Sequence, residues 1–441
     1  MTSPHSLRRE LGLLDATMIN AGSTIASAIF IVPSTVALAF GSTMPTLLIW
    51  VAGGLVTLLG ALCVAELGAA MPEAGGQYVY LERAFHPALG FLYGWAAFVI
   101  INTASIAAVA WAFATYLARL VPMSQGAIPW VAAASIVVLT VLNLRGLRTG
   151  ALTQNILTLI KIGTLAAVAI FALVLPGGTP SNLEPLWPAN PSTLAVALGP
   201  ALVAVLWAYD GWIQSTYVGS EIRDPGRNLP RSIILSTLIV MGTYMAVNAA
   251  FLFLLGPERM GASAQVGSDA MQVVLGSGGE RFIAAAIVIG TLGANNGYIF
   301  TSARIPYAMA VDGKFFQWAG RLDAKTHSPN LVLLVQMVMA LAFTLSGTYE
   351  RLLTYVVFAS FLFYALSAAA VIVLRRREPD LPRPYRAWGY PFTPIVFILF
   401  AIYLVGDTII HSPKESVIGA GIVLLGLPAY YYWKRRSGVA A

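Results

Sequence analysis

The sequence has 441 residues, of which 58% are hydrophobic and 10% are charged, and its mean hydropathy is +0.76. This composition excludes a soluble globular protein. The net charge of +7 does not indicate nucleic-acid binding, because the basic residues lie in short loops between apolar stretches and not on one soluble face. The only cysteine, Cys63, lies inside an apolar run, which excludes a disulfide and a cysteine-rich metal site.

Twelve apolar segments are long enough to cross a bilayer, which takes roughly 20 residues. In chain order they are residues 11–40, 46–70, 88–120, 128–144, 152–175, 194–219, 232–255, 282–310, 331–345, 352–374, 391–410 and 417–433. The start of the chain lacks the compact apolar core and cleavage site of a signal peptide. We therefore expect an all-α, multi-pass protein of the cell (inner) membrane.

The loops between these segments differ in charge. If the N-terminus is cytoplasmic, the outer loops hold Arg119, Arg259, Arg281, Arg351 and Lys414, and all other basic loops are cytoplasmic. The positive-inside rule then places both termini in the cytoplasm. This orientation requires an even number of spans, which agrees with twelve.

Two of the segments are interrupted at membrane depth, at residues 22–30 and at residues 207–212 (WAYDGW). Asp210 costs about 3 kcal/mol to insert there, and Gly211 weakens the helix. Such an interruption is tolerated where protein or a water-filled cavity satisfies the backbone. We interpret residues 207–212 as half of a substrate site.

The interrupted segments open two consecutive sets of five spans, residues 11–175 and 194–374, followed by two accessory helices in residues 391–433. Five spans reverse the orientation of the second set, so the sets would form an inverted repeat within one transporter domain, residues 1–441. Broken helices at corresponding positions of two inverted halves indicate a binding site near the midplane.

The same stretches carry a resemblance to a known family. Residues 207–212, followed by SEIRDPGRNLP at 220–230, resemble helix 6 and the next loop of the L-type amino-acid transporters, which belong to the amino acid–polyamine–organocation (APC) superfamily. Residues 22–30 (GSTIASAIF) are similar to the family's helix 1 motif. The resemblance implies twelve helices in the LeuT-like five-plus-five fold, with helices 1 and 6 broken. It implies a transporter and not an enzyme, with no cofactor and no bound metal.

By this resemblance, the backbone N–H groups of Ser27 and Ala28 hold the substrate carboxylate. The carbonyl groups near Thr24, Ile25 and Trp207 take the α-amino group. A helix N-terminus offers free donors and a partial positive charge, which suits the first of these roles. The alternative for residues 22–30 is close packing by small residues in a membrane helix.

The sequence departs from the family motif at Ala26 and Ala28, where glycine is usual. The amide donors remain, but two methyl groups narrow the pocket. If either position needed a left-handed backbone, alanine would cost about 1–2 kcal/mol.

Trp207 and Asp210 match positions that act as gate and as side-chain selector in the light chain that handles dibasic amino acids. A carboxylate can pair with a cationic substrate side chain in a low dielectric. The alternatives are that Trp207 packs in the core and that Asp210 caps the second half-helix, with Gly211 following at once.

Lys161 lies about nine residues inside the segment 152–175, so it is too deep to snorkel from a helix end. Its insertion costs about 3 kcal/mol, which implies a partner or a role. The resemblance places it on helix 5 beside helices 1 and 8, where sodium-coupled relatives bind a cation. The ammonium would replace the ion and couple the scaffold to the bundle.

Three further features follow from the resemblance. Tyr244 is similar to a helix 7 tyrosine that supports substrate and helix 1. Asn295 and Asn296 match the helix 8 pattern, although both side chains are also ordinary interhelical hydrogen-bonders. The loop 65–78 (AELGAAMPEAGGQY) would supply intracellular gate pairs with Arg231 and Arg304.

The loop between the third and fourth spans, residues 120–128, has no cysteine for a disulfide-linked heavy subunit. We therefore expect a single-subunit, bacterial-type L-type amino-acid transporter, monomeric or weakly self-associating. It would move small and medium neutral L-amino acids, and cationic ones if Asp210 pairs with them, by sodium-independent alternating access, with exchange as the first choice of mode. The alternatives are a proton-coupled symporter and, from another class, an amino-acid sensor that does not transport, or a channel.

Overall fold

The computed structural model describes residues 7–190, 192–346 and 349–436, with backbone alone at 192–193, 349–358 and 415. This part of the chain is helical and contains no strand. The helices are α1 (Leu13–Thr24), α2 (Val32–Phe40), α3 (Thr43–Ala70), α4 (Gln77–Ala84), α5 (Pro87–Ala96), α6 (Asn102–Leu120), α7 (Ile128–Leu144), α8 (Leu147–Val174), α9 (Ser192–Ala208), α10 (Gln214–Tyr217), α11 (Pro225–Ala262), α12 (Val266–Leu275), α13 (Gly278–Ser302), α14 (Arg304–Val311), α15 (Asn330–Ser346), α16 (Tyr349–Arg377), α17 (Phe392–His411), α18 (Pro413–Leu424) and α19 (Gly426–Arg436).

Within the described ranges, nine helical stretches are long and apolar enough to cross a bilayer. They coincide with nine of the expected segments. The other three, residues 11–40, 194–219 and 331–345, correspond to the pair α1–α2 and to the shorter helices α9 and α15. The count of twelve spans stays a prediction.

The first interrupted segment ends its helix at Thr24 and resumes at Val32. Ile25 is extended (ψ 103°), and the 3-10 turn η1 (Ser27–Phe30) stands between the two helices. Ala26 has a φ of −131°, and Ala28 is not among the described residues with positive φ. Neither alanine therefore carries the left-handed strain considered above.

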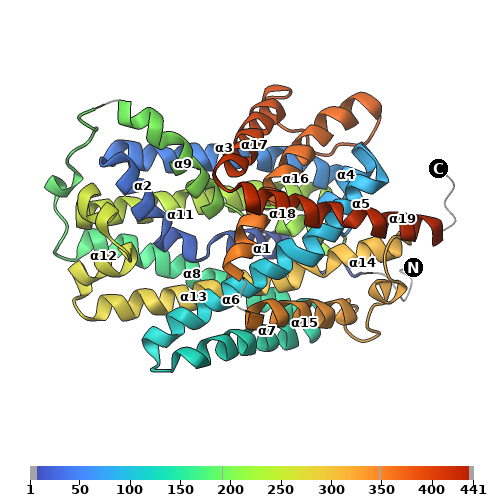
Figure 1. Cartoon of the computed structure of the whole chain (residues 1–441), viewed down its shortest axis with the longest axis horizontal. Helices are drawn as coiled ribbons and strands as arrows, with labels where there is room; N and C mark the ends of the chain where they lie inside the picture. Colours follow the sequence, from blue (N-terminus) through green and yellow to red (C-terminus); the bar gives the residue numbers. More distant parts are fainter. Residues whose placement is uncertain (1–6, 191, 347–348, 437–441) are drawn as a thin grey trace.

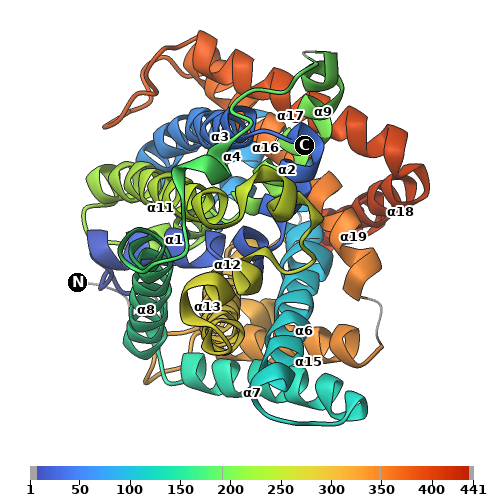
Figure 2. The ribbon, with the colours of Figure 1, turned by 90° about the vertical axis from the view of Figure 1, so that its left-hand side faces the viewer.

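The second interrupted segment leaves the helix after Ala208. After this interruption the helical structure is fragmentary, since only α10 and the 3-10 turn η5 (Gly219–Glu221) form before α11 begins at Pro225. α1 and α9 enter the molecule from opposite ends, and α1 lies among α8, α11 and α13 (Figures 1 and 2).

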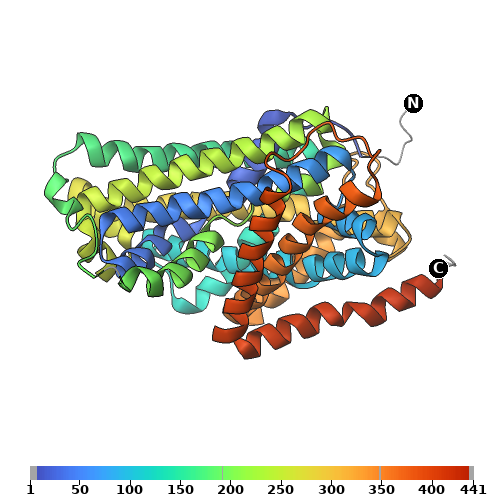
Figure 3. The same ribbon diagram turned by 90° about the horizontal axis from the view of Figure 1, so that it is seen from above.

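Most of the long helices run side by side along the longest axis, with α17 crossing them, so the molecule has two ends (Figures 1 and 3). The end where residues 7–11 lie is called the charged end. It also holds the segments 145–148, 221–227, 312–328 and 375–386. The opposite end holds α12 and the segments 120–127 and 176–190. α18 and α19 lie at the periphery against α16 and α5 (Figure 3).

Candidate functional site

A cavity of about 350 Å³ lies where the two interrupted segments meet. Of the predicted site residues, six line it: Thr24, Ala26, Ser27, Ala28, Trp207 and Asp210. The first N–H groups of a helical turn have no intrahelical acceptor, and η1 opens with Ser27 and Ala28. The cavity thus combines free backbone donors, a carboxylate and a large aromatic side chain.

The two interruptions are in direct backbone contact. Gly211 has a φ of +114°, and a Cβ built on it would lie 2.8 Å from the backbone nitrogen of Thr24. Asn20 of α1 donates from Nδ2 to Oγ of Ser215 in α10 at 2.9 Å, and its Oδ1 accepts from the N–H of Ser215 at 2.7 Å. Gly211 does not line the cavity, but its lack of a side chain permits this close approach.

Lys161 lies behind the first interruption. Its side chain is 3% exposed, and Nζ donates to the carbonyl oxygen of Gly22 at 2.7 Å and to that of Ile25. On the α13 side, Gly293 leaves room for it, because an ideal Cβ there would lie 3.3 Å from Nζ. The lysine therefore lies between α1 and α13, which the resemblance makes the counterparts of helices 1 and 8.

Tyr244 of α11 also contacts the backbone of both interruptions. Its hydroxyl lies 3.2 Å from the carbonyl oxygen of Thr24 and 3.0 Å from that of Ala208. Its one hydrogen serves either acceptor. Of the carbonyl groups predicted to take a substrate amino group, those of Thr24 and Ile25 thus already receive donors from Tyr244 and Lys161, and that of Trp207 accepts from the N–H of Asp210 at 3.2 Å. Each carbonyl oxygen has a second lone pair, so a further donor remains acceptable.

Asp210 does not cap the second half-helix. The N-cap position of α10 is Ile213, which makes no side-chain cap bond, so the capping alternative was wrong. Asp210 Oδ1 instead accepts a 2.6 Å hydrogen bond from the hydroxyl of Tyr364 in α16. Tyr364 was not predicted from the sequence, because a single tyrosine in an apolar segment carries no signal of its partner.

Two contacts lie between Asp210 and the charged end of the molecule. The hydroxyl groups of Tyr93 and Tyr217 lie 2.6 Å apart. Nearer the surface, Arg304 binds both carboxylate oxygens of Glu221, at 2.9 and 3.0 Å, with each side chain 1% exposed. Towards the opposite end, the wall of the cavity extends along α6 from Ser105 to Tyr116.

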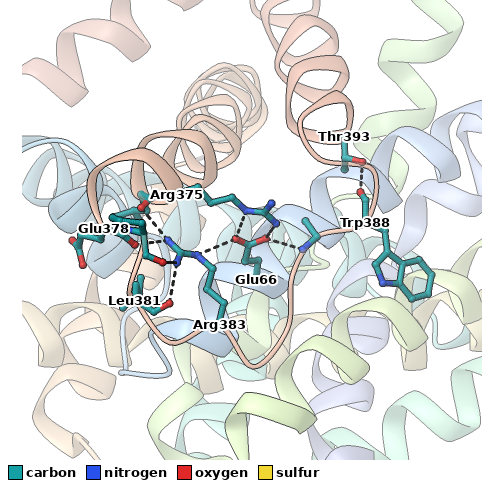
Figure 4. A network of polar contacts seen from close by, with 10 residues as sticks. Glu66, Arg375, Glu378, Leu381, Arg383, Trp388 and Thr393 are labelled. Atoms are coloured by element: carbon teal, nitrogen blue, oxygen red, sulfur yellow. Dashed lines mark hydrogen bonds and ion pairs between the residues drawn. The ribbon is translucent and has the colours of Figure 1, made fainter.

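The expected gate pairs have different partners from those predicted. Glu66 of the loop 65–78 does not pair with Arg231 or Arg304. Its carboxylate binds Arg375 at 2.6 and 2.8 Å, lies 3.4 Å from Arg383, and accepts from the N–H of Ala387 at 2.7 Å (Figure 4). The reason is geometric, because Glu66 near the end of α3 faces the loop that follows α16.

The two asparagines of α13 have different environments. Asn296 forms hydrogen bonds with Asn143, Gly150 and Gln154. It is therefore an interhelical hydrogen-bonder, which was the alternative given for this residue. Asn295 is 1% exposed, and neither its Nδ2 nor its Oδ1 has a partner among the described residues. Asn295 does not line the cavity.

The sequence analysis also missed the third wall, which α6 provides. Ser105, Ala108, Ala112 and Thr115 recur on one face of this helix and line the cavity. Small residues at a spacing of three or four were the available signal. A π-helical turn, η2 (Ala97–Ile101), precedes α6, and such turns are frequent at functional sites.

Known proteins are similar to this chain over most of its length. The sequence profile of the family described as "Amino acid permease" matches residues 11–427. The chain is 30% identical to the serine/threonine exchanger SteT of Bacillus subtilis (strain 168), over 99% of both chains. It is 31% identical to the b(0,+)-type amino acid transporter 1 of Mus musculus, over 97% of this chain and 88% of that protein.

A third relative is the large neutral amino acids transporter small subunit 2 of Homo sapiens, at 32% identity over 98% of this chain and 82% of that protein. The matches to these three relatives confirm the resemblance predicted from residues 22–30 and 207–230. With the apolar helices, they make the chain a multi-pass membrane protein. The chain belongs to the amino acid permease family of the APC superfamily.

Proposed function

We propose that this protein transports amino acids across a membrane, without sodium, by alternating access and with exchange as its mode. The observation that carries the proposal is the cavity between the two interruptions, with Ser27, Ala28, Trp207 and Asp210 in its wall. The η1 donors suit a carboxylate and the carbonyl groups of the interruptions suit an ammonium. The names of the relatives support the same class of substrate.

Alternating access is supported by the contacts that lie on one side of the cavity. The contacts of Tyr93, Asp210 and Glu221 lie on the charged side of the cavity, and α6 lines its path towards the opposite end. In this proposal both termini are cytoplasmic and the conformation faces outward. The helices of 11–175 and 194–374 would be the inverted repeats that rock against each other.

Lys161 supports sodium independence. An ammonium that already donates to two carbonyl groups of α1 occupies the position that a coupling cation would need. Its buried charge also joins α8, a scaffold helix in this proposal, to the moving helix α1. The cavity volume of about 350 Å³ is large enough to hold an amino acid.

The test is uptake into proteoliposomes that are preloaded with unlabelled serine. We expect saturable, stereoselective uptake of labelled serine, competed by small neutral amino acids and stimulated by the internal substrate. Uptake that ignores the internal substrate would replace exchange with uniport or proton coupling. Specific binding without flux would identify a sensor, and a current that does not saturate would identify a channel.

Trp207 offers a test of gating with a matched control. Trp207 lines the cavity, whereas Trp130 of α7 is 67% exposed on the outer face of the helix bundle. Trp207→Ala is expected to lower exchange strongly while substrate binding is retained, and Trp130→Ala should change neither. Unchanged exchange in Trp207→Ala would assign this tryptophan to packing.

A further inference from the structure

A positively charged recess lies at the charged end, between three segments of the chain. Its volume is about 170 Å³. Its lining residues are Arg8, Glu10, Arg145, Gly146, Leu147, Arg148, Lys325, Thr326 and His327. Four cationic side chains thus surround one carboxylate.

Internal pairs do not compensate this charge. Within the described part of the chain, the side chains of Arg8 and Arg145 form no hydrogen bond or ion pair. Arg148 makes one ion pair, with Glu10 at 3.4 Å, and its side chain is 89% exposed, so the pair contributes little. Other basic residues at this end are paired inside the protein: Arg83, Arg304, Lys314, Arg375 and Arg383. Arg9, Arg227 and Arg231 line a second recess at this end and likewise form no ion pair among the described residues, so unpaired basic charge is not confined to the first recess.

The backbone contributes N–H donors, whose partial positive charge has the same sign as the basic side chains. α8 begins at Leu147, directly after Gly146 (φ +113°), so the N-terminus of a 28-residue helix opens into the recess. Its first N–H groups and its dipole favour an anion. The Nδ1 atom of His327 is shielded from solvent and has no hydrogen-bond partner among the described residues.

We propose that this recess binds a phosphate group, presented by the headgroup of an anionic phospholipid or by a soluble phosphate. Guanidinium groups pair with phosphate oxygens in a bidentate fork, and this recess offers three of them with a helix N-terminus. Its volume is several times the roughly 30 Å³ that a water molecule occupies in the liquid. Basic recesses on the cytoplasmic side of membrane helices take lipid headgroups in the same way.

The bound phosphate would join two parts of the protein. Arg8 and Glu10 belong to the N-terminal segment, which is hydrogen-bonded to η5, since the N–H groups of Glu10 and Leu11 donate to the carbonyl oxygen of Glu221 at 2.9 and 3.0 Å. Arg145 lies in the turn between α7 and α8, Arg148 in the first turn of α8, and Lys325 in the loop before α15. A phosphate that contacts both groups of residues is bound more tightly when the charged end is closed. Its binding therefore shifts the population towards the conformation with the charged end closed.

Direct binding tests the site without using transport, so its outcome is independent of the proposed function. Protein in a neutral detergent is titrated with phosphatidylglycerol or phosphatidylcholine, and native mass spectrometry counts the bound lipids. The test variant is Arg145→Gln/Arg148→Gln. The control Arg435→Gln/Arg436→Gln removes two charges from the exposed end of α19.

We expect phosphatidylglycerol to bind the wild type and the control, and to bind the test variant about 30-fold more weakly, at about fivefold for each basic residue removed. Phosphatidylcholine should show no such difference. Lys325→Gln, which keeps the backbone bonds of its loop, is a second variant in case the double variant does not fold, and about fivefold weaker binding is expected.

A parallel titration with inorganic phosphate, at constant ionic strength, follows the thermal midpoint of unfolding. Stabilisation of the wild type but not of the test variant identifies soluble phosphate as a source, whereas lipid binding without this effect identifies the bilayer. Equal binding of both ligands by wild type and test variants would overturn the proposal. An equal loss in the α19 control would also overturn it, because general surface charge would then explain the binding.

Discussion

The hydroxyl of Tyr364 in α16 donates a 2.6 Å hydrogen bond to Oδ1 of Asp210, at the interruption that follows α9. The bond holds one carboxylate oxygen while Asp210 still lines the cavity. It also joins α16 to the interrupted segment that follows α9. Asp210 is therefore both oriented and available to a ligand.

This geometry predicts a selective effect of Asp210→Asn. Asparagine keeps an oxygen for Tyr364 but loses the charge, so affinity for cationic amino acids should fall about 10- to 100-fold and neutral ones should change little. Competition against labelled serine in proteoliposomes measures both classes. Equal losses for both classes would leave Asp210 with a structural role.

Tyr364→Phe is expected to lower uptake of all substrates about tenfold, because a charged acceptor loses its buried donor. Tyr431→Phe is the matched control, since Tyr431 is 57% exposed on α19. Unchanged uptake in Tyr364→Phe would show that transport does not require this hydrogen bond.

Lys161→Met should reduce uptake at least tenfold, because the carbonyl groups of Gly22 and Ile25 lose their buried donor at a cost of about 1–3 kcal/mol each. Lys414→Met, at an exposed position, is the control.

In the wild type, replacing sodium by choline at constant pH should leave initial uptake unchanged. A clear sodium requirement would contradict the place given to Lys161.

Gly211→Ala is expected to lower both uptake and the thermal midpoint of unfolding. Alanine at a φ of +114° is strained, and its Cβ would lie 2.8 Å from Thr24 N and 2.9 Å from the carbonyl carbon of Ser23. Gly242→Ala, on an open face of α11, meets no atom within 4 Å and should be neutral or slightly stabilising. Equal uptake and equal thermal midpoints in the two variants would show that the protein tolerates a larger distance between the two interruptions.

Arg304→Met should destabilise the protein by about 3–5 kcal/mol, since it leaves the carboxylate of Glu221 buried without its partner. Arg83→Gln breaks a half-exposed ion pair with Glu378 and should cost less than about 1 kcal/mol. Thermal unfolding measures both.

The same pair should control access to the charged end. In a Cys63→Ala background, a cysteine placed by Ser220→Cys, whose native hydroxyl is buried, should react with maleimide faster when Arg304 is Met. A labelling rate that does not change would show that Glu221 and Arg304 stabilise the fold without closing this end.

Ala28→Gly should broaden substrate selectivity towards larger side chains. Ala28 lines the cavity and is not strained, so its methyl group takes up ligand space without a backbone penalty. One methyl group in a pocket is worth about 1–3 kcal/mol, so a tenfold shift of the phenylalanine-to-serine ratio is expected. A ranking that stays the same in a transporting variant would show that this methyl group does not set specificity.

The sequence alone located the apolar helices and both interruptions, because bilayer thickness dictates segment length and a buried aspartate beside a glycine is costly in lipid. The depth of Lys161 followed from the same reasoning, and so did its need for a partner. These features depend on residues that are close in the chain, so periodicity and local composition reveal them.

Only the tertiary structure decided which groups meet. Tyr364 and Asp210 are 154 residues apart, and Glu66 and Arg375 are 309 apart. Several basic residues could have paired with Glu66, and helix packing selected Arg375 and Arg383 over Arg231 and Arg304. Hydrogen bonds across helices depend on tilt, register and rotation, which no local pattern specifies, so the gate pairs were predicted wrongly while the spans that carry them were predicted correctly.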